Sequence, residues 1–524
     1  MASEGLHAPQ DHGAILCVPP LDAAEQLLTA NHRLFRSADV RILDQPLPVF
    51  REQARQGALR LADEFARACG FSGPLTGSGL LIMTGHQPEL FHPGVWLKNF
   101  AVHQLARRLG GVGCNLLVDN DIVVSPAIKV PVRLSGRPVA LPVLFDRPRL
   151  PIPWEEWKVV EEERFASLPK TVAEITSDWP FRPVLGDFWV LLGHGPLLGE
   201  RFAAGRHRLE ERWGCRNWEL PLGRLCDQAA FQQFFLHIVL NLPHFWEAYN
   251  QALTEYRRRR RLKSIRHPIP NLDRQGDWLE APFWIWSGAQ PQRQRLYVLR
   301  QGDAIRLGIG TQTVATLSAS QAGKWDQCPV WKDLAERGWK VRSRALTTTL
   351  FVRLCLADLF IHGIGGAIYD EITDGIMRRF FGLEPPGFFT VTGTLRLPFA
   401  ACRDSRSQDA SVAELRQRLR DLRYKPERWL GNDFRQEVRQ LVEIKRRLVA
   451  EQPADPDARR RRWRTLQTIT EELSDFLGGE IEQVKGQLRQ TEEASQELAV
   501  LCSREYAFCL HPEAELRSWL TAPL

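Results

Sequence analysis

The chain has 524 residues, of which 44% are hydrophobic and 25% are charged. This much apolar material excludes a disordered chain and is typical of a folded, enzyme-sized protein with about three structural units. The formal net charge of +7 is offset by acidic residues nearly everywhere, which argues against the concentrated basic face of a nucleic-acid-binding protein.

Residues 1–78 predict a helical lead-in. Apolar residues recur at three-to-four spacing over Leu21 to Phe35 and over Phe50 to Phe65, and Pro46 and Pro48 separate the two stretches. The N-terminus lacks a basic start followed by a long apolar core, so it does not predict a signal peptide, and we expect a cytoplasmic protein.

Residues 79–135 change to the pattern of an α/β fold. A short apolar run, GLLIMT, ends in the loop GHQPELFHPG, and the amphipathic stretch VWLKNFAVHQLARRLGG follows. A second short apolar run, NLLVDND, comes next. Strand, helix and strand in succession are the unit of a parallel sheet, so we expect the first half of an α/β core here.

Residues 136–340 are mixed in pattern and rich in proline and tryptophan, and we interpret them as inserted connecting subdomains. Helices are expected around 155–175, 196–213 and 225–262, and a strand-like patch at Arg295 to Leu307. Residues 341–404 carry a long helical pattern, a glycine turn and a second helix, and are expected to form the second half of the core.

Residues 405–503 shift to long charged helices with few aromatics. One helix is predicted from Trp429 to Glu451 and another from Arg459 to Cys502, and the second carries apolar residues at three-or-four spacing. We predict a helical hairpin or coiled-coil arm here, followed by a C-terminal segment at residues 504–524.

Two further properties limit the class of protein. No window offers the ~18 uncharged apolar residues of a membrane helix, since the best candidate, Ala345 to Tyr369, contains Arg353, Asp358 and His362. The ten cysteines lie far apart without a Cys-x-x-Cys pair, which argues against a disulfide framework and a zinc ribbon. We therefore predict buried cysteines and no metal site.

The stretch MTGHQPELFHPGVWLKN is the most informative motif. A strand, a polar glycine loop and a helix start place backbone amides and the helix dipole where an anion can bind. His86 and His92 are candidates to donate to a phosphate or to act as acid or base, and Lys98 to neutralise it. Neither Walker A nor Gly-x-Gly-x-x-Gly is present, and a helix cap with a packed turn is the alternative. The residues expected to cluster are Thr84, Gly85, His86, Gln87, His92, Gly94 and Lys98.

The second motif, LLVDNDIVVSP, ends an apolar strand in Asp119, Asn120 and Asp121, at the edge where open α/β sheets bind ligands. Carboxylates two residues apart on a strand point to the same face. Asp119 and Asp121 are thus candidates to share Mg²⁺, to bind a ligand amine or hydroxyls, or to act as a base. The alternative is a strand-ending turn in which they cap backbone amides.

The third motif, LFIHGIGGAIYDEITD, places Gly363, Gly365 and Gly366 at a helix start, with Tyr369 following on the helix. Glycine lets the backbone approach a ligand closely, which favours a place in a binding site. Tight helix–helix crossing explains the same glycines equally well.

The order of these motifs resembles the bacillithiol-biosynthesis cysteine-adding enzymes (the BshC family), ligases that join cysteine to glucosaminyl malate. The family's Thr-Gly-Gln-Gln loop, Leu-Phe-x-Gly-Pro helix entry and Glu-Asp-His-Asp strand end correspond to residues 84–87, 90–94 and 118–121. Its Arg-Pro-led helix and its Gly-Pro-Gly-Glu-x-x-Tyr turn correspond to Arg344-Ala345 and residues 363–369. The departures are His86 for Gln, Asn120 for His, and Val118 and Gly366 for Glu.

The resemblance implies an α/β fold with a Rossmann-like core of the nucleotidyltransferase and class I aminoacyl-tRNA synthetase type. Inserted subdomains and a C-terminal α-helical coiled coil that pairs two subunits as a homodimer would complete it. The implied activity is a carbon–nitrogen ligase that adds cysteine, or a similar amino acid, to the amine of an amino-sugar conjugate. ATP or ADP with Mg²⁺ is the implied cofactor.

In this interpretation His86, His92 and Lys98 hold a phosphate or carboxyl group, and Asp119 or Asp121 orients or deprotonates the attacking amine. The expected catalytic residues are His86, Asp119 and Asp121. The expected binding residues are Thr84, Gly85, Gln87, His92, Gly94, Lys98, Asn120, Arg344, Gly363, Gly365, Gly366 and Tyr369.

Two other interpretations remain open. A nucleotide- or small-molecule-binding protein on the same fold, without ligase chemistry, is compatible with Asn120 and Gly366. A coiled-coil scaffold or RNA-binding protein would use the Arg-rich arm, although no aromatic stacking signature is interleaved with the runs Arg257 to Arg261 and Arg459 to Arg462. Solvated helix faces explain these runs better.

Overall fold

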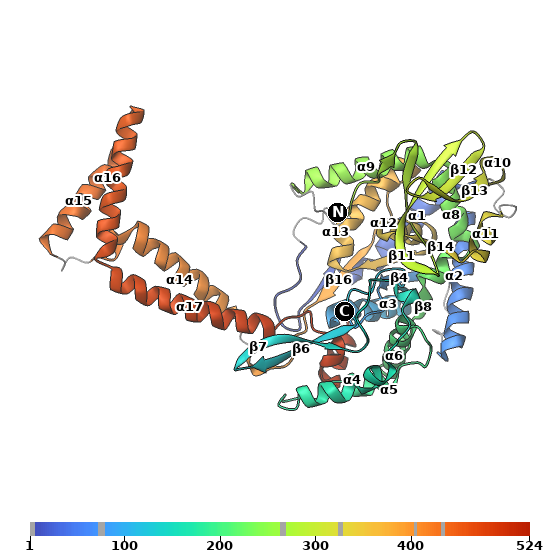
Figure 1. Ribbon diagram of the computed structural model, residues 1–524, viewed down its shortest axis with the longest axis horizontal. Coiled ribbons are helices and arrows are strands. Elements are labelled where there is room, and N and C mark those ends of the chain that lie inside the picture. Colours follow the sequence, from blue (N-terminus) through green and yellow to red (C-terminus); the bar gives the residue numbers. More distant parts are fainter. Residues whose placement is uncertain (1–5, 72–78, 263–268, 323–328, 403–405, 431–434) are drawn as a thin grey trace. The chain divides into compact units, whose positions relative to one another are not determined.

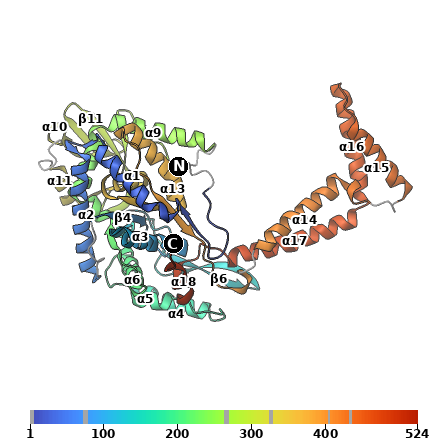
Figure 2. The same cartoon turned by 180° about the vertical axis from the view of Figure 1, so that it is seen from behind.

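The computed structural model describes residues 6–71, 79–262, 269–322, 329–402, 406–430 and 435–524. The chain divides into two compact units (Figure 1 and Figure 2). The larger unit is formed by Met1–Val130, Pro142–Leu395 and Arg504–Leu524, and the smaller unit by Pro131–Leu141 and Arg396–Ser503. Within the described residues, every helix is too short or too polar to span a membrane.

A six-stranded sheet forms the centre of the larger unit. Its order is β1 (Ile15–Val18), β16 (Phe389–Gly393), β15 (Leu359–His362), β4 (Leu81–His86), β5 (Val112–Leu117) and β8 (Trp218–Pro221). The strands from β16 to β8 are parallel, and β1 is antiparallel at the edge. β5 is buried along its whole length, as is usual for parallel strands covered on both faces. The predicted mixed α/β fold with a parallel sheet is confirmed.

The order in which successive strands are added to this sheet reverses in its middle. Helix α3 (Pro93–Leu109) leads from β4 to β5 toward one edge, and α13 (Ile364–Ile376) leads from β15 to β16 toward the other. β15 and β4 are direct neighbours in parallel register. The two connections therefore diverge at the carboxyl ends of β4 and β15, where open α/β sheets leave a crevice for a ligand.

A second, antiparallel sheet lies between β8 and β15 in the sequence. Its order is β13 (Gln312–Ser318), β12 (Ala304–Ile309), β11 (Gln290–Gln301), β10 (Trp278–Ser287) and β14 (Trp339–Ser343), and β9 (Arg274–Gln275) pairs with β10. The single strand-like patch predicted at Arg295 to Leu307 is two strands, because a turn at Gly302, with φ of 61°, reverses the chain within it. Two hairpins, β2 (Arg41–Ile42) with β3 (Gln45–Pro46) and β6 (Ala127–Leu134) with β7 (Arg137–Leu144), complete the strands described.

The helical stretches predicted in the N-terminal and inserted regions are confirmed. The further helices of the larger unit are α1 (Ala24–Ser37), α2 (Leu47–Cys69), α4 (Glu162–Ile175), α5 (Leu185–Val190), α6 (Leu198–Arg212), α7 (Leu222–Cys226), α8 (Ala229–Leu240), α9 (Leu242–Arg259), α10 (Ala319–Ala322), α11 (Val330–Glu336), α12 (Ala345–Phe351) and α18 (Glu513–Leu520). Phe231 of α8 contacts Phe283 of β10 and Phe351 of α12, with ring centroids 6.2 and 5.3 Å apart. This aromatic core joins the second sheet to α12, which precedes β15.

Helices make up most of the smaller unit: α14 (Arg406–Tyr424), α15 (Gln436–Ala450), α16 (Pro456–Asp475) and α17 (Gly478–Leu501). Leu422 of α14 packs with Val484 of α17, and Val438 of α15 packs with Leu473 of α16. The prediction of one helix from Arg459 to Cys502 is wrong. Helix α16 ends at Asp475 and helix α17 begins at Gly478, so a turn at Phe476 and Leu477 separates two helices. Part of the helix predicted from Trp429 lies outside the described residues.

One pair of cysteines forms a disulfide that the sequence analysis did not predict. Cys402 and Cys502 form a disulfide although they are 100 residues apart in the sequence. Their spacing gave no signal because tertiary packing brings the end of α17 beside the turn that precedes α14. Most of the free cysteines are buried as predicted, Cys17 and Cys69 are half-buried, and Cys328 lies outside the described residues.

Candidate functional site

A cavity of about 720 Å³ lies at the carboxyl ends of β4, β15 and β16, where the order of strand connection reverses. Its size is typical of a small-molecule site. We call it the main cavity. Of the residues predicted in the three motifs, it is lined by Gly85, His86, Gln87, His92, Gly94, Lys98, Asp121, Gly363, Gly365 and Gly366.

Two helices begin at the main cavity. The Ncap residue of α3 is His92, whose Nδ1 accepts a hydrogen bond of 3.1 Å from the amide of Gly94. Helix α13 begins at Ile364, and Gly365 and Gly366 of its first turn line the cavity. The first amides of a helix have no acceptor within the helix, and the helix dipole makes this end partially positive. Both helix starts can therefore bind a negatively charged group.

Gly94 serves the packing of α3 as well as the cavity. A Cβ at this position would lie 2.2 Å from the carbonyl oxygen of Gly393, at the end of β16. Only glycine therefore lets the start of α3 approach the sheet this closely. The alternative of a helix cap with a packed turn thus applies to Gly94, whereas a Cβ on Gly365 would meet no atom within 4 Å, so no helix–helix crossing requires that glycine.

Lys98 is a buried cation at this cavity, with 4% of its surface exposed. Its Nζ donates a hydrogen bond of 3.0 Å to the carbonyl oxygen of Gly85. Burial, together with the positive charge of Arg206, lowers the pKa of Lys98 to about 8. Among the described residues no carboxylate forms an ion pair with Lys98. A buried charge without a counter-charge is costly, so an anionic ligand beside Lys98 would be stabilising.

His86 and His92 are neutral at physiological pH. Burial is the main cause that lowers the pKa of each to about 3; Lys98 adds to the effect at His86, and Arg504 and Lys98 add to it at His92. The Nδ1 of His86 lies 3.2 Å from the carbonyl oxygen of Gln87, which assigns the hydrogen to Nδ1 and leaves Nε2 as an acceptor. In His92, Nδ1 accepts from Gly94, and Nε2 lies 3.4 Å from Nη2 of Arg504.

Arg504 is a residue of the site that the sequence did not indicate. It lines the main cavity, and its guanidinium donates to Thr392 Oγ1 at 3.2 Å and to Thr394 Oγ1 at 3.1 Å. Its Nε also lies 3.1 Å from Glu505 Oε1. It comes from the C-terminal segment, where no motif precedes it, so no local pattern could have identified it.

Asp119 and Asp121 do not share one face, and the prediction of a paired carboxylate site is wrong. β5 ends at Leu117, so the alternation of a strand no longer applies to the turn that follows. Asp121 lines the main cavity and accepts from Gln87 Nε2 at 2.8 Å and from Arg293 Nη1 at 2.9 Å. Asp119 accepts instead from the amide of Gly223 at 2.7 Å.

Asp119 belongs to a separate cluster with Glu155, Asp227 and Arg342, beside a small cavity of about 210 Å³. Burial and the neighbouring carboxylate of Glu155 raise the pKa of Asp119 to about 8. The turn alternative of the sequence analysis therefore describes Asp119, whose carboxyl group caps a backbone amide.

Asn120 and Arg344 line a second small cavity that adjoins the main one, since Asp121 and Thr348 line both. Asn120 donates to the carbonyl oxygen of Ser343 at 2.9 Å. Arg344 donates to Glu280 at 2.5 Å and lies over the ring of Trp284. The structure thus places Arg344 next to the main cavity, already paired with a carboxylate.

The structure brings neither Thr84 nor Tyr369 into the main cavity. Thr84 is buried, and its hydroxyl donates to the carbonyl oxygen of Ile361 at 2.8 Å, between the two central strands. Tyr369 is half-buried on α13 and does not line the cavity. The cavity also includes His362, at the end of β15, and Thr349 of α12, which the motifs did not single out.

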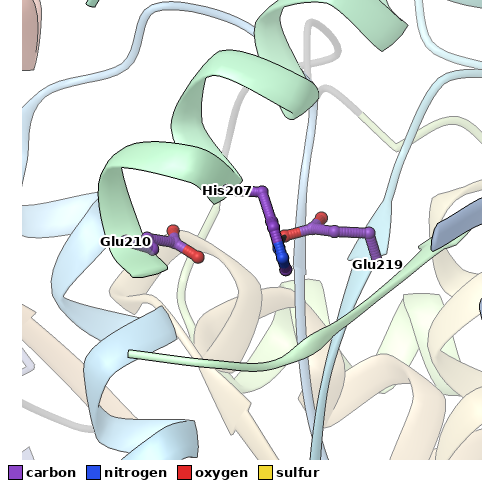
Figure 3. Close-up of side chains that lie close together, drawn as sticks. All are labelled: His207, Glu210 and Glu219. Carbon is purple, nitrogen blue, oxygen red and sulfur yellow. Dashed lines mark ion pairs between the residues drawn. The ribbon is translucent and has the colours of Figure 1, made fainter. Parts of the chain in front are cut away.

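A second group of potential ligands, His207, Glu210 and Glu219, is buried elsewhere in the larger unit (Figure 3). Their potential ligand atoms lie within 4.8 Å of one another, close enough to hold a metal ion. Arg206, however, donates to Glu219 at 2.5 Å, and its Nε lies 3.2 Å from Glu210. Because the guanidinium of Arg206 already contacts both carboxylates and His207 lies 3.6 Å from Glu219, we interpret the group as an ion-pair network between α6 and β8.

No protein-family model matches this chain, and a search of curated proteins finds no match. The residues that line the main cavity are compatible with a phosphate group, because two helix starts, Lys98 and Arg504 meet there. They do not form a Mg²⁺ site by themselves. Asp121 and Glu505 are its carboxylates among the described residues, and each already contacts an arginine. Mg²⁺ would therefore be held chiefly by the phosphates of a nucleotide.

Proposed function

We propose that the protein is a carbon–nitrogen ligase of the bacillithiol cysteine-adding type. It would join cysteine, or a similar amino acid, to the amine of a small amino-sugar conjugate such as glucosaminyl malate. The observation that carries the proposal is Lys98, a buried cation beside two helix starts with no ion-paired carboxylate among the described residues. This arrangement suits an anion that forms or departs during reaction.

The sheet supports the finer fold assignment, a Rossmann-like core of the nucleotidyltransferase and class I synthetase type. The order in which its parallel strands are connected reverses between β4 and β15, and the main cavity lies at that point. ATP bound with Mg²⁺ would supply the activation of the carboxyl group. The chain would bind the phosphate with Lys98, Arg504 and the amides of α3 and α13.

The amine substrate is assigned to the side of the cavity that holds Asp121. This carboxylate is fixed by Gln87 and Arg293, so its position relative to the bound carboxyl group is set before the amine arrives. His86 presents the acceptor atom Nε2 and can orient a hydroxyl or amine hydrogen. Asp119 takes no part, because it lies in the cluster around Arg342.

A nucleotide-binding protein without ligase activity is the second candidate. The position of Asp119 favours it, because only Asp121 of the predicted carboxylate pair faces the main cavity. The two candidates share the fold and the phosphate site and differ in the chemistry that follows.

We also propose that the protein is a cytoplasmic homodimer, joined by a coiled coil of the smaller unit. Support comes from large apolar side chains on its helices, since Trp463, Val449 and Phe476 are 64%, 59% and 45% exposed. Against it, Leu473 and Val484 of the predicted apolar stripe are buried within the same chain. Light scattering during gel filtration measures the mass, and a monomer would overturn the dimer.

The experiment for the ligase is mass spectrometry of purified protein incubated with ATP, Mg²⁺, cysteine and glucosaminyl malate. The expected result is a condensed product together with AMP or ADP, formed only when the protein is present. ATP retained by the protein without a product would favour the binding protein. Neither product nor retained ATP would contradict both candidates.

A further inference from the structure

His362 ends β15 at the main cavity and is held in one orientation. Its ring is 4% exposed and packs against Phe360 and Phe388, with ring centroids 4.5 and 4.8 Å away. Its Nε2 lies 2.9 Å from Oδ2 of Asp370, on the following helix α13. The same side chain also lines the main cavity.

The partner of His362 is itself fixed as an anion. Asp370 is buried and forms an ion pair with Arg353, which also donates to Asp374 at 2.7 Å and to the carbonyl oxygen of Pro386 at 2.5 Å. Although burial acts in the opposite direction, the charges of Arg353 and His362 hold the pKa of Asp370 well below its usual value. A carboxylate can only accept a hydrogen bond, so the neutral imidazole carries its hydrogen on Nε2.

The opposite ring nitrogen, Nδ1, is then an acceptor. A Cβ on Gly366 would lie 2.8 Å from it, so this edge of the ring faces the first turn of α13, which lines the cavity. Gly366, which stands where the family pattern has Glu, thus makes room for the His362 ring. No hydrogen bond to Nδ1 is formed by the residues that the structure describes.

We propose that His362 is the general base of the reaction and that Asp370 is its positioning residue. The proposal rests on the ligase function proposed above. The amine nitrogen attacks the activated carboxyl carbon and forms the C–N bond, while the C–O bond to the phosphate breaks. The leaving phosphate keeps the electron pair of that bond, and the amine proton passes to Nδ1 of His362.

Two other groups at the cavity are poorer bases. The Nε2 of His86 is also an acceptor, but its Nδ1 contacts a neutral carbonyl group, and the carboxylate of Glu89 lies 3.8 Å from that nitrogen, beyond hydrogen-bonding distance. Asp121 is already bound by Arg293. Only His362, among the described histidines that line the cavity, has a carboxylate within hydrogen-bonding distance to stabilise its imidazolium form.

The dependence on pH has a definite sign. Burial is the largest cause that lowers the pKa of His362 below 6.5, Arg353 and Lys98 act in the same direction, and Asp370 opposes them. Phe360 and Phe388, which also pack against the ring, carry no charge. Since the base must be neutral, kcat/KM should fall as the pH drops through the pKa of His362. Removing the charge of Asp370 should lower this pKa further and move the acid limb to lower pH.

The kinetic test compares His362→Gln, Asp370→Asn and His103→Gln in the full-length protein, using the ligase assay. General-base catalysis contributes about 10² to 10⁴ in rate, so His362→Gln should lower kcat by about 100-fold or more with little change in KM. Asp370→Asn should lower kcat less and shift the acid limb. His103 lies on α3 outside the main cavity and should leave both unchanged. Normal kcat in His362→Gln, or an unmoved acid limb in Asp370→Asn, would overturn the proposal.

A second measurement needs no substrate, so it separates this proposal from the ligase function. NMR spectra of protein labelled with ¹⁵N-histidine report which ring nitrogen carries the hydrogen, and His362→Gln identifies the signal among the 13 histidines. The expected result at pH 7 is a neutral ring protonated at Nε2, with that preference lost in Asp370→Asn. A neutral ring protonated at Nδ1 would overturn the assignment of His362 as the base, even if the protein forms product. The expected tautomer without any product would instead contradict the ligase function.

Discussion

Lys98 and Arg342 are both buried cations near the carboxyl edge of the central sheet, yet their surroundings differ. Arg342 donates to both oxygens of Glu155, at 2.9 and 3.0 Å, and to Asp227 at 2.7 Å. Lys98 donates to the single carbonyl oxygen of Gly85. The protein thus satisfies one cation with its own carboxylates, whereas the other lies beside a cavity where a ligand can complete its contacts.

The two aspartates of the second motif also differ in their surroundings. Asp119 joins the cluster of Arg342 and is held by a backbone amide, while Asp121 faces the main cavity beside Gln87. Proximity in sequence therefore says little about their roles. What distinguishes the two aspartates is the cavity that each one lines, the main cavity for Asp121 and the small cavity beside Arg342 for Asp119.

The largest expected effect is a loss of stability when Arg342, the cation with carboxylate partners, is replaced. Arg342→Leu removes one member of the buried pair with Glu155, which within the described part of the chain keeps only Lys340 at 3.5 Å, and such a loss costs about 3–5 kcal/mol. Lys98→Met removes a buried cation without an ion-paired carboxylate, so near pH 7 it should leave the protein as stable as the wild type or more stable. Urea unfolding measures both, and equal losses would contradict the contrast between the two cations.

The second effect is the pH dependence that Lys98 confers. Its pKa of about 8 in the folded protein lies below the 10.5 of a free lysine, mainly because of burial. The unfolded state therefore binds more protons between these values, and the stability contribution of Lys98 rises with pH by ~3 kcal/mol from pH 8 to 10.5. The difference in unfolding free energy between the wild type and Lys98→Met, measured by urea unfolding over this pH range, isolates the contribution of Lys98. A constant difference between the two proteins would show that the lysine is not desolvated.

The third effect concerns catalysis and uses the two aspartates as a matched pair. Asp121→Asn should lower product formation by about 100-fold, which corresponds to ~2.7 kcal/mol, while the protein stays folded. Asp119→Asn should retain activity, because a pKa of about 8 keeps this group largely protonated at pH 7, and an amide resembles a neutral carboxyl group. The ligase assay at pH 7 measures both. Full activity in Asp121→Asn would remove it from the mechanism.

The smallest effect is expected at the start of α13. Gly365→Ala meets no atom within 4 Å and should stabilise the helix by up to about 1 kcal/mol, while its methyl group enters the cavity and weakens ATP binding. Gly94→Ala is the contrasting variant, because its Cβ would strike Gly393 and should cost about 1–3 kcal/mol. Thermal unfolding and calorimetric titration with ATP measure the two effects. Unchanged ATP affinity in Gly365→Ala would argue against phosphate at this helix start.

Local signals predicted much of this site. The apolar run of β4, the glycine loop and the helix start at Pro93 lie within one short stretch, so their geometry follows from chain connectivity. That geometry brought His86, His92 and Lys98 to one cavity as expected. The glycines of the third motif joined them because parallel strands place their carboxyl ends, and the helices that follow, at the same edge.

The remaining features could not be predicted from local pattern. The end of β5 at Leu117 turns Asp119 away, and the alternation rule assumed a longer strand. Arg504 comes from a segment without a motif, and the pairing of His362 with Asp370 depends on where Arg353 fixes the carboxylate.

The sequence by itself determined the mixed α/β composition, the strand and helix that form the first motif, and the helices of the inserted region. These depend on hydrophobic period and on glycine and proline positions, which act over a few residues. Tertiary structure alone decided which strands are neighbours, that Cys402 meets Cys502, and which buried charges are satisfied. These properties depend on contacts between residues far apart in the chain, and a local pattern contains no information about such contacts.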